Sequence, residues 1–129
     1  MIRYLLDTVT LIHLGRHSAA VAGWLQRERA RHSSVGVCGI VVTELLSRGH
    51  PEEMPAIDLV LANVDHWPIL HEDAVDAGMR RYALARRGIQ AQLTDALIAA
   101  VARRMGATVV SENVADFMAL GIPVVDPGR

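Results

Sequence analysis

Short apolar runs alternate along the chain with longer segments in which apolar residues recur every three or four positions. The short runs predict five buried strands, at residues 2–6, 34–38, 66–70, 107–111 and 122–125. The longer segments predict seven helices, near residue 8, over 18–31, 40–48, 51–63, 71–87 and 94–105, and near residue 116. Gly49, Gly88 and Gly106 follow three of these helices, and Pro51 stands in the first turn of another, where proline is favoured.

This alternation predicts an α/β fold with a central parallel sheet covered by helices on both faces. A chain of 129 residues suits one domain, 1–129, and is long enough to bury a core. In open α/β sheets the ligand site lies beyond the carboxyl ends of the strands, so functional side chains are expected there.

The composition indicates where in the cell the protein is expected. No apolar run approaches the roughly 20 residues that a membrane helix needs, and Met1 leads directly into the first predicted strand without a signal peptide. The single cysteine, Cys38, cannot form an internal disulfide and is expected in the core. We therefore expect a cytoplasmic protein without a membrane segment. Because 51% of its residues are hydrophobic, we also expect a protein partner, including a second copy of the chain.

All 13 basic residues are arginine, and this excludes several functions. A phosphate-binding P-loop and a Schiff-base enzyme both need a lysine. The net charge of -1 argues against a chain that binds nucleic acid over its whole surface, although a local basic groove is compatible with it.

Four carboxylates stand out because they follow predicted strands or start predicted helices. Asp7 follows the first strand, Glu44 lies in the helix after the second, Asp95 starts the sixth helix, and Asp116 follows the fourth strand. Each has an ordinary explanation when taken singly. Asp7 suits a helix cap, Asp95 and Asp116 suit first helical turns, and Glu44 suits an exposed place beside the core. Asn113, in the loop before Asp116, is typical of a turn.

Taken together, the four carboxylates would converge on one end of the sheet. Several carboxylates in one cleft repel each other unless a proton or a cation compensates their charge. Mg²⁺ and Mn²⁺ favour such oxygen ligands and reverse the local charge, which allows a phosphodiester to bind. The pattern therefore indicates metal-assisted hydrolysis.

Four segments, in this order, carry a resemblance to a known family: LLDTVTLI, VVTELL, LTDALIAAVA and GATVVSENVADF. They resemble the PIN domain and, more narrowly, the VapC-type toxins of bacterial toxin–antitoxin pairs. The resemblance extends over essentially the whole chain. No single motif is specific, but their order and spacing at this length are.

The resemblance implies an endoribonuclease that depends on Mg²⁺ or Mn²⁺, is inhibited by a cognate VapB-type antitoxin protein and is often a homodimer. It also implies a parallel sheet of four to five strands in the order 3-2-1-4-5, which brings Asp7 and Asp116 together. Asp7, Glu44 and Asp95 match the three acidic positions that mark the active site of this family. Asp116 matches the fourth, and Asn113 is a nearby polar position. We therefore expect the four carboxylates to hold the metal and RNA to be the substrate.

The chain departs from the family pattern at Val9. Members of the family usually have asparagine or serine two residues after the first aspartate, whereas Thr8 is retained here. Loss of a polar group that orients a ligand or water can cost about 10- to 100-fold in activity. A catalytically weakened PIN-like module that acts by binding antitoxin or RNA is therefore the alternative function. Val9 also argues against a phosphatase of the haloacid-dehalogenase type, which needs an acid there, and the lack of lysine argues against a receiver domain.

Pairs of arginines border the predicted helix 71–87. Arg86 and Arg87 end it, beside the Gly88 loop, and Arg80 and Arg81 precede them. A solvated helix face accounts for these residues, and so does a rim that contacts RNA phosphates beside the acidic site.

Overall fold

The computed structural model describes residues 1–128 and contains one parallel sheet of five strands. The strands are β1 (Arg3–Leu6), β2 (Ser34–Cys38), β3 (Asp65–Trp67), β4 (Thr108–Val110) and β5 (Val124–Val125). Their order is β3-β2-β1-β4-β5, so the predicted fold class and strand order are confirmed. In the central strand, Tyr4 is in register with Val35 on one side and with Thr108 on the other.

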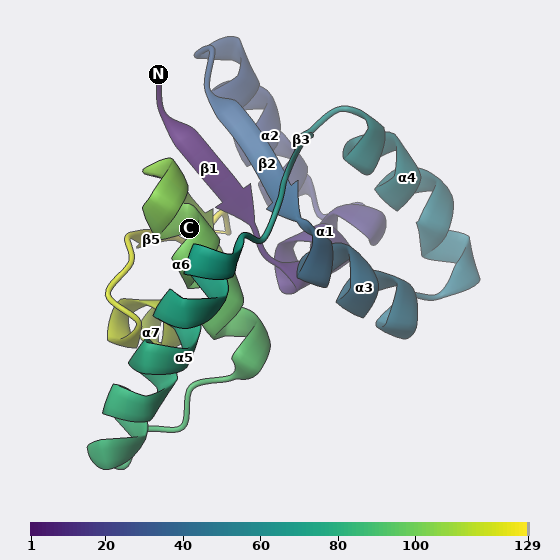
Figure 1. Cartoon of the computed structure of the whole chain (residues 1–129). Helices are drawn as coiled ribbons and strands as arrows, with labels where there is room; N and C mark the ends of the chain where they lie inside the picture. The colour runs from purple at the N-terminus through teal and green to yellow at the C-terminus, as the bar shows by residue number, and fades with distance from the viewer. Residues whose placement is uncertain (129) are drawn as a thin grey trace.

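Helices connect the strands and flank the sheet (Figure 1). They are α1 (Thr8–Gly15), α2 (Ala19–Ala30), α3 (Gly39–Arg48), α4 (Met54–Ala62), α5 (His71–Arg86), α6 (Leu93–Met105) and α7 (Val114–Ala119), with a 3-10 turn η1 (Pro51–Glu53) before α4. Helix α6 packs on β1 and β4 and also contacts α5 and α3, whereas α1 contacts α3 and α4. Within residues 1–128, no helix combines the length and the apolar character needed to cross a bilayer.

Prolines explain three differences between the expected and the observed elements. The strand expected at 66–70 ends at Trp67, because Pro68 has no amide hydrogen for the ladder. Pro123 has the same effect, so the last strand begins at Val124. The helix expected over 51–63 is a 3-10 turn followed by α4, because Pro55 cannot donate the α-helical hydrogen bond to the carbonyl of Pro51.

The hydrophobic core lies around the three inner strands. Leu5, Val37 and Val109 are completely buried, as expected for strands with helices on both faces. Cys38 is buried, as predicted. Gly36, in the middle of β2, lies directly under the indole of Trp67.

A buried ion pair fixes α5 against α6. Asp73, in the first turn of α5, is only 2% exposed, and both of its oxygens accept hydrogen bonds from the Arg104 guanidinium at 3.0 Å. One of the two also accepts from the Leu70 amide at 2.8 Å, and Arg104 donates in addition to the carbonyl of Pro68. These bonds tie the carboxyl-terminal end of α6 to the start of α5.

The Gly36–Trp67 contact predicts a large effect of adding one methyl group. A Cβ at residue 36 would lie 2.5 Å from the ring of Trp67, so the indole or the strand must shift. We expect Gly36→Ala to lower the free energy of unfolding by about 1–3 kcal/mol, measured by urea denaturation. Gly78→Ala is the matched control, because a Cβ there meets no atom within 4 Å on the exposed side of α5. The control should gain stability, by about 0.5–1 kcal/mol. Equal midpoints for the two variants would contradict this packing.

Candidate active site

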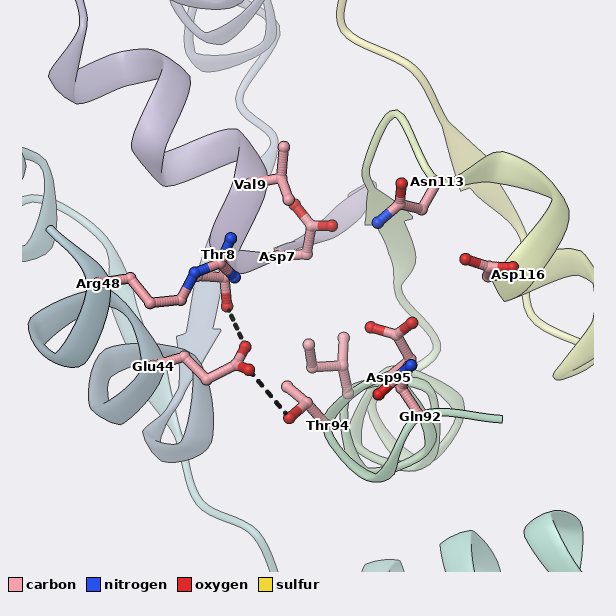
Figure 2. A pocket seen from close by; sticks show the side chains of 11 residues that line it. Asp7, Thr8, Val9, Glu44, Arg48, Gln92, Thr94, Asp95, Asn113 and Asp116 are labelled. Atoms are coloured by element: carbon pink, nitrogen blue, oxygen red, sulfur yellow. Dashed lines mark hydrogen bonds between the residues drawn. The ribbon is translucent and has the colours of Figure 1, made fainter. Parts of the chain in front are cut away.

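A pocket of about 280 Å³ opens where β1, β2 and β4 end and the following helices begin (Figure 2). Its lining contains all four predicted carboxylates and the predicted polar residues. The full lining is Asp7, Thr8, Val9, Glu44, Arg48, Gln92, Thr94, Asp95, Ile98, Asn113 and Asp116. Parallel pairing of β1 with β2 and β4 brings together residues that are far apart in the sequence. Of this lining, sequence reasoning missed Arg48, Gln92, Thr94 and Ile98.

Asp7 has both of the roles that the sequence left open, since it caps a helix and also lines the pocket. One of its oxygens accepts a hydrogen bond from the backbone amide of Thr10 at 2.9 Å, which caps α1. The residue is only 3% exposed. Burial raises the pKa of Asp7 above its ordinary value, and hydrogen bonds from Ser111 and Thr10 counteract part of this rise. The Asp7 carboxylate lines the pocket, where it can accept further hydrogen bonds or bind a cation.

Glu44 is held between two other helices. The Thr8 hydroxyl, at the start of α1, donates to one carboxylate oxygen at 2.7 Å, and the Thr94 hydroxyl, in the first turn of α6, donates to the other at 3.3 Å. Figure 2 shows the carboxylate between these two hydroxyl groups. Glu44 is half-buried on α3, so it is not the freely exposed residue of the ordinary explanation. This contact joins α1, α3 and α6 at one side of the pocket.

Asp95 has the most perturbed acidity in the pocket. It lies half-buried in the first turn of α6. Burial is the largest cause that raises its pKa, to about 6, and the negative charges of Asp7, Asp116 and Glu44 raise it further. The four carboxylates are therefore close enough to repel each other, which is the conflict anticipated from the sequence.

Asp116 and Asn113 form the opposite wall of the pocket. Asn113 precedes α7, and its backbone amide donates to the Ser111 hydroxyl at 2.9 Å, which fixes the turn after β4. Asp116 follows in the first turn of α7 and is exposed. Figure 2 shows both side chains on the side of the pocket across from Glu44. Asn113 therefore serves the turn with its backbone and leaves its side-chain amide at the pocket.

The donor set of the pocket consists of oxygen atoms, which suits a hard divalent cation. Within residues 1–128, no three Asp, Glu, His or Cys side chains are gathered closely enough to hold a bare ion by themselves. A hydrated ion, with some of its ligands supplied by water, therefore matches this lining better than a fully dehydrated one.

The arginines at the end of α5 do not line this pocket. The Arg86 guanidinium lies over the ring of Tyr82, 4.7 Å from its centroid, and Arg87 follows it at the end of the helix. Arg80 forms an ion pair with Asp76. RNA binding by Arg86 and Arg87 stays a prediction, and Arg48 is the basic residue that the structure places in the lining.

Comparisons with known proteins agree with this architecture. A family model described as the PIN domain matches residues 4–118. A chain of VapBC2 from Rickettsia felis, solved with a promoter DNA fragment, superposes with a TM-score of 0.84 at 20% identity, covering 96% of this chain and 98% of that chain. DNA-bound VapBC from Salmonella typhimurium gives 0.82 at 20% identity, covering 98% and 99%. Mycobacterium tuberculosis VapC20, a toxin that cleaves the sarcin–ricin loop, gives 0.67 at 20% identity, covering 92% and 95%. No curated protein matches the chain.

The raised pKa of Asp95 predicts how its replacement alters stability. The pKa of Asp95 in the folded protein, about 6, exceeds the ordinary value, so the folded state favours the protonated carboxyl. The protonated side chain therefore contributes its full stabilisation below about pH 4, and this contribution is lost as the pH rises through 6. Without metal at pH 8, Asp95→Asn should therefore be more stable than the wild type by about 1 kcal/mol, after allowance for the partial exposure of the site.

This gain should shrink as the pH falls toward about 4, where the wild-type carboxyl is largely neutral in the folded protein and about half ionised in the unfolded chain. Urea denaturation across this pH range measures the difference. Asp58→Asn removes a carboxylate from an exposed position on α4, outside the pocket, and is the matched control. A constant difference between Asp95→Asn and the wild type would show that neither burial nor charge repulsion raises the pKa of Asp95 in the folded protein.

Proposed function

The chain belongs to the PIN-domain family of nucleases, and on this premise we propose that it is a metal-dependent endoribonuclease that hydrolyses RNA phosphodiester bonds. The observation that carries the proposal is the convergence of four carboxylates on one pocket, where burial raises the pKa of Asp95 and the charges of the other three raise it further. Repulsion between carboxylates costs stability, and a divalent cation relieves it. A pocket that holds several carboxylates together therefore suits metal binding.

The four carboxylates have two kinds of role in the proposed reaction. Asp7, Asp95 and Asp116 are the residues that would hold Mg²⁺ or Mn²⁺, together with water. The ion would supply positive charge for the phosphodiester and increase the acidity of a water molecule. Glu44, whose oxygens are fixed by the Thr8 and Thr94 hydroxyls, is oriented to share in holding the ion or to accept a hydrogen bond from the attacking water.

The biological role that we propose is that of the toxin in a VapBC-type toxin–antitoxin pair. The structures from Rickettsia felis and Salmonella typhimurium are VapBC assemblies, and VapC20 is a toxin that cleaves the sarcin–ricin loop. By this similarity, a cognate VapB-type antitoxin protein would inhibit the chain, and the active form would be a homodimer. RNA is then the substrate and the antitoxin the regulatory partner.

One residue favours the alternative of a catalytically weakened module that acts by binding. Val9, in the first turn of α1, places an apolar side chain next to Asp7 in the lining of the pocket, where Ile98 is the other apolar residue. If a polar group at this position orients water or the metal, its absence reduces turnover without removing the four carboxylates.

Replacement of Asp95 tests the proposed reaction. Asp95→Asn keeps the size of the side chain but removes its charge, so we expect cleavage of total cellular RNA in Mg²⁺ to fall by about 100-fold or more. EDTA should have the same effect on the wild type. Circular dichroism should show an unchanged fold, and Asp58→Asn should cleave like the wild type. Wild-type cleavage that persists in EDTA would contradict a metal-dependent reaction.

Replacement of Val9 distinguishes the two functions. If the present site is weakened, Val9→Asn should increase the cleavage rate by about 10-fold or more, because a polar group regains its place beside Asp7. Val9→Ala is the control, since it changes the volume without adding a polar group. An active wild type whose rate is the same with asparagine at position 9 would argue against the weakened module.

A further inference from the structure

Arg48 occupies an unusual position for a cation. It is the last residue of α3 and the only basic side chain that the described part of the chain contributes to the pocket lining. The other groups around it include four carboxylates, with which a guanidinium readily pairs. Within residues 1–128, however, its side chain forms no ion pair or hydrogen bond.

Glu44 is well placed for an ion pair with Arg48, but the two residues form none. A glutamate four residues before an arginine on a helix is well placed for an ion pair. Both oxygens of Glu44 accept hydroxyl hydrogens instead, from Thr8 at 2.7 Å and from Thr94 at 3.3 Å. Figure 2 shows the Glu44 carboxylate between these two hydroxyl groups, with Arg48 extending from the same helix. The two threonines therefore keep Glu44 engaged and leave the guanidinium available.

Most other arginines in the described chain are already engaged by the protein. Carboxylates pair with Arg16, Arg31, Arg80, Arg103 and Arg104. Backbone carbonyls accept from Arg3, Arg29 and Arg81, and Tyr82 contacts Arg86. The arginines without such a contact are Arg27, Arg48 and Arg87, and only Arg48 of these three lines the pocket.

We propose that Arg48 is the phosphate-binding residue of this site and holds the non-bridging oxygens of an RNA phosphodiester beside the carboxylates. A guanidinium presents a planar fork of donors that matches two phosphate oxygens, and it keeps its charge at any physiological pH. In an acidic pocket it supplies the fixed positive charge that the RNA backbone needs for its approach. This inference rests on the proposed ribonuclease function and adds to it the residue that holds the substrate.

Steady-state cleavage of a short fluorogenic single-stranded RNA in Mg²⁺, at a series of NaCl concentrations, tests the proposal. We expect Arg48→Ala to lower kcat/KM by about 10-fold through loss of one charge-assisted contact. The slope of log kcat/KM against log salt concentration should become shallower by about 0.7, the value for one phosphate contact to a single strand. Arg48→Lys should keep the slope and lose only part of the rate, because lysine retains the charge without the fork.

Arg27→Ala is the matched control. Arg27 is an exposed and unpaired arginine on α2, so its removal changes the net charge by the same amount away from the pocket. It should leave both the rate and the salt slope unchanged. Since Arg48 is exposed and unpaired, its replacement should also leave the urea midpoint unchanged, which separates a binding effect from a loss of stability.

The outcomes that overturn the proposal can be told apart. An active wild type with Arg48→Ala equal to it in rate and salt slope would overturn the role of Arg48 alone. The same result, accompanied by weaker binding of the antitoxin, would assign Arg48 to the protein interface instead. A wild type that does not cleave RNA would overturn the proposed function, and the phosphate contact with it.

Discussion

The burial of a carboxylate at the end of the central strand constrains everything around the pocket. Asp7 ends β1, is 3% exposed, and cannot withdraw into solvent without breaking the cap of α1. Burial of a charge is costly unless other groups compensate it. The Thr10 amide and the Ser111 hydroxyl supply part of that compensation. The remainder has to come from outside the protein or from a proton, and this is the physical basis for expecting a cation.

The fold adds electrostatic repulsion to the cost of burying Asp7. Pairing of β1 with β4 brings the Asp116 loop alongside Asp7, and α6 directs Asp95 at both. The Asp73–Arg104 pair attaches the far end of the same helix to α5. Glu44 is bound to Thr8 and Thr94 and cannot turn away. The fold thus holds negatively charged side chains together in the absence of a ligand, as expected for a preorganised cation site.

Much of this could be read from the sequence, because periodicity and position determine it. Alternating apolar runs specified the parallel sheet, and the rule for α/β sheets placed Asp7, Glu44, Asp95 and Asp116 at one edge. The ends of elements were less predictable, since single prolines such as Pro68 and Pro123 end or delay a strand whose apolar pattern continues. Helix spacing alone would pair Glu44 with Arg48. The contacts to Thr8 and Thr94, which are 36 and 50 residues from Glu44, override that pair and exist only in the folded chain.

A calorimetric titration with Mg²⁺ at neutral pH tests whether the four carboxylates form one cation site. Cleavage assays cannot separate binding from chemistry, whereas the heat of binding reports the ion alone. We predict saturable binding to the wild-type protein and much weaker binding to Asp95→Asn, with Asp58→Asn unchanged. Equal binding to the wild type and Asp95→Asn, or no binding to the wild type, would contradict it.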